Sequence, residues 1–410
     1  MKGTSLHRAV TAAFAGALLL LSGCGDTLRP VANPLPQTGG PDPQAASFAL
    51  VVSAPPTSAG APAPQRILSV FNMPGDTVLG QVSVGTGANF VTTPDAVRGL
   101  ITDSAENTLT IVTNLSSQFS QSPTVAAIAL QPGAAPDQVI TNGTTAYTSN
   151  VGNGTVGVVS LITNVEQTEV PVGANPVSLA LPTNANKLYA VTNASANGGQ
   201  DGVAVVSTAD NTLLSTLTGA NGIGVNPVQV VASPDGSNVF VVNNGSSTVS
   251  QISTANDTIV NQPIAVAAGP TSATFDSKLT RLLVVSPGSG TVTVIDVNSS
   301  SATFQRATQI TLPAGSSPVS VTVAGDGTRA YVANAGTNSV SVVDVLGLRL
   351  VGSPIAVGGA APQSIASSSD GTKVIVTKAD NTVTMLSTAS NSTTATLGLP
   401  GTPMSLSVNP

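Results

Sequence analysis

The sequence predicts an all-β protein made of repeated units of four antiparallel strands, and three observations lead to this. Of its 410 residues only 8% are charged and 3% aromatic, whereas 40 are Gly and 29 are Pro. Many of the rest are β-branched or turn-forming residues, which favour strands over long helices. Strand motifs recur every 43 to 50 residues, with Asp-Gly turns between strands. Repeats of this length with four strands each are typical of β-propeller blades.

Two strand motifs define the units. The first is YVAN, and its counterparts begin at Leu50, Leu100, Tyr147, Ala190, Phe240, Leu283, Tyr331 and Ile375. The second is SVSVVD, and its counterparts begin at Ile67, Thr108, Thr155, Gly202, Thr248, Thr291, Ser339 and Thr382. Each motif occurs eight times, so the sequence predicts eight blades.

A third element, Gly-x-x-Pro followed by a strand, completes the unit. It occurs around Pro136, Pro176, Pro227, Pro318, Pro362 and Pro403, with a shortened form at Pro270. A fourth strand ends near the IAVGG sequence at 355–359. Val342 and Val343 are adjacent, so they point to opposite faces of their strand. Both faces of the inner strands should therefore be buried, as stacked blades require.

The two ends of the repeat region complement each other. The first unit has strands near 48–53, 67–72 and 77–84, but no Gly-x-x-Pro strand before them. The last segment, GTPMSLSVNP, supplies a strand at 404–408 with nothing after it. We expect this strand to be the innermost strand of the first blade, since an open ring would expose two sheet edges. A seven-bladed ring with the first unit packed outside it is the alternative.

The N-terminal segment is predicted to be a signal peptide, residues 1–23. Lys2 and Arg8 precede an apolar run from Ala9 to Leu21, which is too short to span a bilayer. The sequence Leu-Ser-Gly-Cys resembles a bacterial lipobox, which implies that Cys24 is lipidated; an ordinary signal peptide with an unmodified Cys is the alternative. Residues 24–44 are rich in Pro and Gly and are expected to form a tether.

The resemblance implies a lipid-anchored protein of the bacterial cell envelope, on the periplasmic or cell-surface side. Gly25 follows the lipidated Cys, where Asp favours inner-membrane retention in some bacteria, so the outer membrane is favoured. The membrane would be contacted through the lipid anchor alone.

Cleavage would remove most of the residues that catalytic and metal sites need. His7, the only histidine, would be lost, and Cys24 would be modified. This excludes Ser-His-Asp and Cys-His catalysis and the usual zinc, haem and copper ligands. No D-x-D-x-D run suggests a Ca²⁺ site, so we expect no metal and no cofactor. The chain would keep 19 acidic residues and lose two of 13 basic ones, giving a net charge of −8 that argues against nucleic acid as a partner.

The repeats resemble the YVTN family of β-propellers. The similarity lies in YVAN at Tyr331, YTSN at Tyr147 and AVTN at Ala190, and it covers about residues 45–410. It implies a β-propeller over this whole region. Members are usually extracytoplasmic binding or surface proteins, and similar repeats occur in lactonase-type propellers and surface-layer proteins.

Antiparallel pairing assigns the turns to two rims. The first rim carries the turns between second and third strands and the links between blades; the second rim carries the other turns. Two long loops, 54–66 and 194–202, fall on the first rim, where loops commonly carry recognition. Asn in such turns either adopts positive φ or forms a ring of amides for peptide or glycan. The candidate binding rim consists of Arg66, Asp103, Glu106, Asn150, Asn193, Asp201, Asn243, Asn334, Lys378 and Asp380.

The second rim is predicted to be a solvated face, because basic and acidic residues are mixed there. The basic residues are Arg98, Lys187, Lys278, Arg281, Arg329, Arg349 and Lys373. A lactonase-type site would need a carboxylate at the axial cleft, and the sequence offers only Glu106, Glu166 and Glu169 as Glu. The last two fall at a second-rim turn and an outer strand.

The sequence therefore favours a binding or scaffold module over an enzyme, its partner a protein or a polysaccharide of the cell envelope. The alternatives are a lactonase-type hydrolase and a structural envelope protein.

Overall fold

The computed structural model describes residues 48–56, 65–87, 89–92, 98–115, 123–183, 186–193, 200–276 and 281–408. The chain divides into residues 1–30 and a compact unit of residues 31–410, and all the described residues belong to the second. Cys24, the tether, Lys278 and most of the two long loops lie outside the described residues. Among the described residues no helix is both long enough and apolar enough for a membrane crossing.

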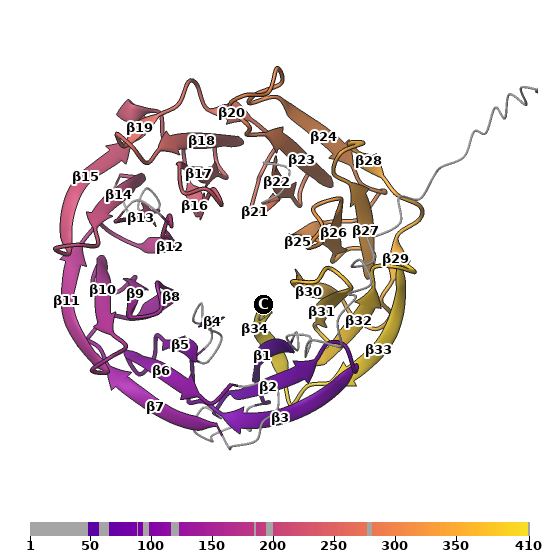
Figure 1. The fold of residues 1–410 in the computed structure, drawn as a ribbon, viewed down its shortest axis with the longest axis horizontal. Helices are drawn as coiled ribbons and strands as arrows, with labels where there is room; N and C mark the ends of the chain where they lie inside the picture. Colours follow the sequence, from indigo (N-terminus) through magenta and orange to yellow (C-terminus); the bar gives the residue numbers. More distant parts are fainter. Residues whose placement is uncertain are drawn as a thin grey trace, which may run out of the picture. The chain divides into compact units, whose positions relative to one another are not determined.

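Eight antiparallel sheets form a ring of blades around one axis (Figure 1). We number the blades 1 to 8 in chain order. The innermost strands are β34 (Thr402–Val408), β4 (Asn89–Thr92), β8 (Pro136–Thr141), β12 (Pro176–Ala180), β16 (Pro227–Ala232), β21 (Ser272–Asp276), β25 (Pro318–Val323) and β30 (Pro362–Ser367). The second strands are β1 (Phe48–Ala54), β5 (Gly99–Asp103), β9 (Thr145–Asn150), β13 (Lys187–Thr192), β17 (Asn238–Asn243), β22 (Arg281–Ser286), β26 (Arg329–Asn334) and β31 (Lys373–Lys378).

The outer half of each blade consists of a third and a fourth strand. The third strands are β2 (Ile67–Asn72), β6 (Thr108–Thr113), β10 (Thr155–Ser160), β14 (Gly202–Ser207), β18 (Thr248–Ser253), β23 (Thr291–Asp296), β27 (Ser339–Asp344) and β32 (Thr382–Ser387). The outer strands are β3 (Thr77–Ser83), β7 (Thr124–Ala129), β11 (Val165–Pro171), β15 (Thr212–Thr218), β24 (Ala307–Thr311) and β33 (Ser392–Gly398). In blades 5 and 7 the outer strand is split into β19 (Thr258–Ile259) with β20 (Ile264–Ala265), and β28 (Arg349–Leu350) with β29 (Ile355–Ala356).

Strand β34 closes the ring, as the sequence predicted. It pairs antiparallel with β1, with Ala49 opposite Val408 and Val52 opposite Ser405. The first unit is thus an ordinary blade, with order β3-β2-β1-β34. The eight-bladed prediction is confirmed and the seven-bladed alternative is wrong.

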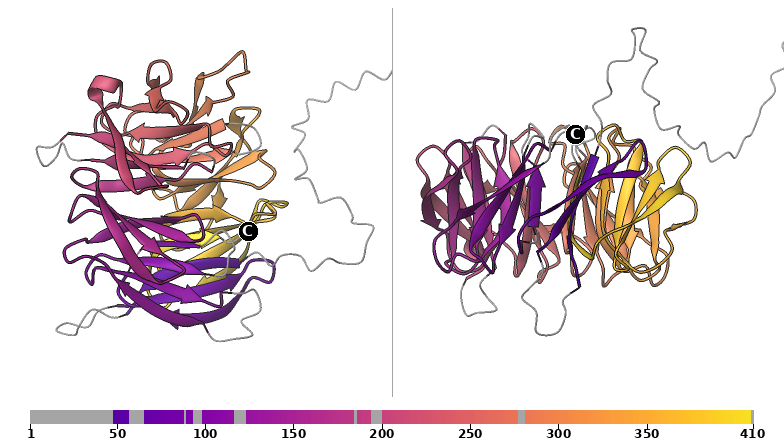
Figure 2. Two further views of the ribbon diagram at one scale, coloured as in Figure 1. Left: turned by 60° about the vertical axis from the view of Figure 1, so that its left-hand side comes forward. Right: turned by 90° about the horizontal axis from the view of Figure 1, so that it is seen from below.

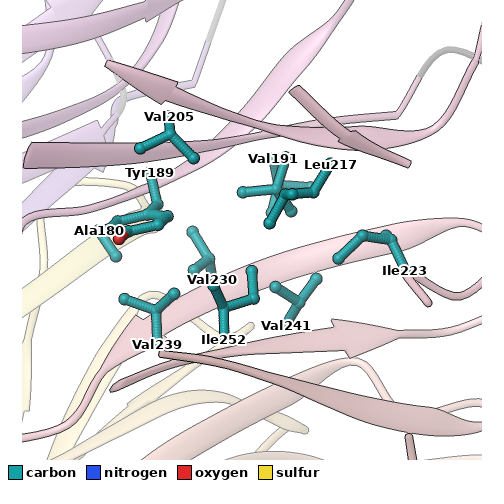
Figure 3. Close-up of a cluster of buried hydrophobic side chains, with 11 residues drawn as sticks. Ala180, Tyr189, Val191, Val205, Leu217, Ile223, Val230, Val239, Val241 and Ile252 are labelled. Carbon is teal, nitrogen blue, oxygen red and sulfur yellow. The ribbon is translucent and has the colours of Figure 1, made fainter. Parts of the chain in front are cut away.

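Each pair of neighbouring blades encloses one apolar cluster. Figure 3 shows the cluster between blades 4 and 5, where Val205 and Tyr189 of blade 4 face Val239 and Ile252 of blade 5. Val342 packs into the cluster between blades 7 and 8, whereas Val343 packs into the one between blades 6 and 7. Inner strands are therefore apolar on both faces. Full burial of one such Val stabilises the fold by about 1.5–3 kcal/mol.

The strands run between the two rims, as the edge-on view in Figure 2 shows. The turns of the first rim lie so close to the links that some of their residues must be glycine. A Cβ on Gly336 would lie 2.0 Å from the Gly315 carbonyl oxygen, and one on Gly152 would lie 2.0 Å from that of Gly133. The contact therefore requires glycine in the turn, whereas the glycines of the Gly-x-x-Pro pattern, such as Gly133 and Gly315, have φ angles of 81° and 78°, which glycine adopts without strain.

Candidate functional site

The second strand of every blade ends at the first rim in a buried polar side chain. These residues are Ser53, Asp103, Asn150, Thr192, Asn243, Ser286, Asn334 and Lys378. Asn334 Nδ2 donates to the hydroxyls of Ser339 and Ser341 at 3.2 and 2.8 Å, and Asn243 bonds in the same way to Thr248 and Ser250. The role of these amides is to join the second strand to the third.

Most candidates on the first rim are held within the turns. Asn150 Nδ2 donates to Thr155 and to Glu169 Oε1. Asp103 accepts from the backbone N–H groups of Thr86, Ala105 and Glu106. Asn150, Asn243 and Asn334 have no exposed surface, so they do not form the open ring of amides considered from the sequence. Their φ angles are not positive either; in the described first-rim turns and links, positive φ is found at Asn107, Asn175, Asn226, Asn338 and Asn381.

Asn193 and Asp201 are brought together at the base of the 194–202 loop. Asn193 Nδ2 donates to Asn226 Oδ1 at 2.6 Å, and the Asn226 N–H donates to Asp201 Oδ2 at 2.7 Å. The pairing of β12 with β13 also shows that the first motif of this unit was placed one residue too late, at Ala190 in place of Tyr189. Thr192, not Asn193, occupies the place of Asn150, because both lie opposite the first proline of the inner strand.

Arg66, Glu106, Lys378 and Asp380 do not converge on one site. Arg66 is half-buried, and Glu106 and Asp380 are exposed on different blades. Lys378 is buried, and its Nζ donates to the carbonyl oxygens of Val357 and Gly358 at 3.1 and 3.4 Å. Its distance from Asp380 Oδ2 is 3.8 Å. Lys378 therefore anchors the link between blades 7 and 8.

The sequence predicted that the basic residues of the second rim are solvated. This prediction is wrong for four of them, which bind the neighbouring blade instead. Each lies at the start of a second strand, Arg98 directly before it, and reaches the third-to-fourth-strand turn of the next blade. Lys187 Nζ lies 2.8 Å from Asp257 Oδ2, and Lys373 Nζ lies 2.8 Å from Asp76 Oδ2. Arg98 and Arg329 donate to the carbonyl oxygens of Leu161 and Thr388. These residues join neighbouring blades, because the packing of one blade on the next brings each cation beside a turn of the following blade.

The tyrosines of the first motif make the same kind of contact. Tyr189 Oη donates to Asp257 Oδ1 at 2.6 Å, and Tyr331 Oη donates to Asn391 Oδ1 at 3.1 Å. Burial, followed by the bond to Asp257 and its charge, raises the pKa of Tyr189. Burial raises the pKa of Tyr331 to about 12, with Arg329 opposing.

The innermost strands, which line the axis (Figure 1), carry a recurrent bulge near their first-rim end. It falls between Pro176 and Ser178, between Pro227 and Gln229, and at matching places in four other blades. The residue after the proline is bulged, and a bulge can re-aim a side chain beside a functional site. These residues are Asp137, Val177, Val228, Val319, Gln363 and Met404.

Asp137 is the only charged residue among the bulged positions. Asn89 of the neighbouring inner strand donates from Nδ2 to Asp137 Oδ1 at 2.9 Å. Burial raises the pKa of Asp137, and the bond from Asn89 partly offsets this. Sequence reasoning missed Asp137. Its signal was a carboxylate directly after the Gly-x-x-Pro proline, where three other units have Val.

Glu166 and Glu169 lie on outer strand β11, away from the axis as the sequence indicated. Within the described residues no group of three or more His, Cys, Asp or Glu side chains is placed to hold a metal ion. Asp137, a half-buried carboxylate on an innermost strand with a bond from Asn89, is the candidate for chemistry that we consider further.

The fold defines the chain as a β-propeller, and comparisons with known proteins refine this. The model of a family described as "Lactonase, 7-bladed beta-propeller" matches residues 261–405, which cover blades 6 to 8 and part of β34. This chain differs from that description in having eight blades. No curated protein matches the sequence.

Solved structures with low sequence identity share the fold. Apo AztD from Citrobacter koseri is 13% identical, with a TM-score of 0.67 over 89% of this chain and 98% of that chain. A putative 6-phosphogluconolactonase from Bacteroides fragilis is 14% identical, with a TM-score of 0.57 over 90% of this chain and 100% of that chain. Hydrazine synthase from Kuenenia stuttgartiensis is 19% identical, with a TM-score of 0.57 over 75% and 97%. At these identities the likeness concerns the fold alone.

Proposed function

We propose that the protein is a lactonase-type hydrolase with Asp137 as general base. The observation that carries the proposal is a half-buried carboxylate, that of Asp137, on an innermost strand, held by Asn89. The match of residues 261–405 to a lactonase family supports the reaction class. This reverses the preference drawn from the sequence, which lacked a carboxylate at the axis.

The proposed reaction needs no histidine. The Asp137 carboxylate accepts a proton from water as the water oxygen bonds to the lactone carbonyl carbon. The ring C–O bond then breaks, and the alkoxide takes this proton from Asp137 to give a hydroxy acid. A raised pKa suits a group that gains and returns a proton near neutral pH. Asn89 acts as a positioning residue, because it fixes one carboxylate oxygen.

The test is hydrolysis of a panel of five- and six-membered lactones by the purified chain, followed by proton release. We expect Asp137→Asn to lower kcat/KM at least about 100-fold with an unchanged unfolding midpoint. Glu106→Gln is the matched control and should keep full activity, because Glu106 is exposed on a first-rim turn. Absence of turnover across the panel, or an active Asp137→Asn variant, would contradict the proposal.

A second candidate is a binding or scaffold role with a protein or polysaccharide of the cell envelope. Exposed apolar side chains of blades 3 and 4 support it, including Ile162 in the turn between β10 and β11, which is 76% exposed. The lipid anchor at Cys24 belongs to this proposal as well. Metabolic labelling with a radioactive fatty acid should mark the protein, and Cys24→Ser should abolish the label and release the protein from the membrane fraction. A labelled Cys24→Ser variant would contradict the anchor.

A further inference from the structure

The innermost strands of blades 3, 4 and 5 are joined by side chains that bond to the backbone of the next blade. Gln138 Oε1 accepts the Leu179 N–H, and Ser178 Oγ accepts the Val230 N–H at 3.1 Å. In both pairs the acceptor directly follows the bulged residue of its own strand, and the donor lies two residues after the bulged residue of the next strand. The bulged residues of these three blades therefore lie at the same level around the axis.

These three bulged residues are Asp137, Val177 and Val228, and each is partly exposed. The two valines also pack against the apolar clusters between blades, which fixes their positions. An innermost strand is covered on both faces by the neighbouring blades and along one edge by the second strand (Figure 1). The surface that remains exposed therefore opens toward the axis and the first rim. A molecule that reaches Asp137 there meets valine on the next two blades.

The innermost strands carry negative charge and no positive charge. The sequences of these eight strands contain two charged residues, Asp137 and Asp276, and no Lys, Arg or His. Residues 93–97, which follow β4 of the neighbouring blade, contain no basic residue either. The buried cation of the first rim, Lys378, is bonded to the carbonyl oxygens of Val357 and Gly358. A phosphate group beside the Asp137 carboxylate would meet a like charge, with no cation on these strands to offset the repulsion.

We infer that the substrate is an uncharged lactone with an alkyl substituent, and that Val177 and Val228 determine this specificity. The inference rests on the function proposed above. The ring carbonyl lies at Asp137, and the alkyl group covers the exposed surface of the two valines, where removal of apolar surface from water favours binding. The hydroxyl groups of a sugar lactone would lose water against valine without gaining a hydrogen-bond partner.

The test compares four lactones that share a six-membered ring and differ in their substituents. They are δ-valerolactone, δ-decalactone, glucono-δ-lactone and 6-phosphoglucono-δ-lactone. Proton release by the full chain gives kcat/KM for each lactone after the spontaneous rate has been subtracted. We expect kcat/KM for δ-decalactone to exceed that for each of the other three at least about tenfold, because only its pentyl group buries apolar surface on the valines.

A substitution at one valine tests the residues themselves. Val228→Ser should lower the preference for δ-decalactone over δ-valerolactone at least about fivefold, mainly through a higher KM for δ-decalactone. Val319→Ser is the matched control, since Val319 holds the same bulge position in blade 7, which lies across the axis from blade 3 (Figure 1). It should leave the preference unchanged. Thermal unfolding shows whether both variants are folded.

The possible failures of this test are distinguishable. Similar kcat/KM values for δ-decalactone and δ-valerolactone, or a higher value for either sugar lactone, would overturn the inference and leave the lactonase reaction in place. So would a loss of preference in Val319→Ser equal to that in Val228→Ser. If none of the four lactones were hydrolysed, the proposed function and the inference would both be wrong. The comparison of the four lactones uses the unaltered chain, so it does not depend on the folding of any variant.

Discussion

Lys373 and Asp76 join the last blade to the first, with 2.8 Å between Nζ and Oδ2 across 297 residues of chain. Lys373 begins the second strand of blade 8, and Asp76 lies in the turn after β2 of blade 1. The pair repeats the geometry of Lys187 and Asp257 between blades 4 and 5. The seam of the ring therefore has a side-chain bond on the second rim in addition to the backbone pairing of β34 with β1.

Removing the cation at the seam should weaken the fold. Lys373→Met leaves the Asp76 carboxylate partly buried and unpaired, so the free energy of unfolding should fall by about 1.5–3 kcal/mol. Urea denaturation measures this. Arg349→Met is the control: its 3.7 Å contact with Asp344 is within one blade and Arg349 is 58% exposed, so the expected loss is about 0–1 kcal/mol. Equal losses of unfolding free energy in Lys373→Met and Arg349→Met would show that the contact between Lys373 and Asp76 stabilises the fold no more than an exposed ion pair does.

Loss of the closing strand should be more severe. A chain that ends at Gly401 lacks β34 and uncovers one edge of β1. Leu50 and Val52 on one face, and Ala49 and Val51 on the other, would lose cover. We expect a loss of at least about 3 kcal/mol in unfolding free energy, together with aggregation. Calorimetry and light scattering test this against a chain that ends at Val408. A truncated protein as stable as that control would contradict the closure.

Alkaline pH should destabilise the protein through its tyrosines. All three have raised pKa values, that of Tyr331 reaching about 12. Above about pH 10 the unfolded chain loses phenolic protons that the folded chain keeps, so stability falls as pH rises. For Tyr331 the limiting slope between pH 10 and about pH 12 is about 1.4 kcal/mol per pH unit. Absorbance at 295 nm should rise together with unfolding, and Tyr331→Phe should show a shallower decline. Phenolate absorbance in the folded protein at pH 10 would refute this.

The buried amides of the first rim should act on stability and not on recognition. Asn334→Ala leaves the Ser339 and Ser341 hydroxyls without their shared donor, which should cost about 1–3 kcal/mol. Asn153→Ala, on the same rim, removes an exposed amide with 3.3 and 3.4 Å contacts and should change stability little. Thermal unfolding compares the two variants. If Asn153→Ala were the more damaging, this assignment would fail.

The repeat pattern was sufficient to predict the blades, their strand order and the closing strand. These follow from local periodicity and from the need to cover both edges of β1. The role of Lys187 was not predictable, because the distance between a cation and a turn 70 residues away depends on how far each blade is twisted. The burial of Asn243 was missed for a similar reason: it is covered by the link at Gly224, which precedes the inner strand of the same blade and whose approach depends on how the blades pack. Asp137 needed the bulge to be seen before its place near the axis could be assigned.

The pairing of β1 with β34 also sets how the ring responds to force. Ala49 lies opposite Val408, so the N-terminal end of β1 and the C-terminal end of β34 lie side by side at the same rim. Tension applied between Phe48 and Val408 would load the backbone hydrogen bonds between β1 and β34 one after another, starting at this end of the pair. The propeller should therefore yield at its seam at low force, while the other seven blades, joined through continuous chain, stay intact.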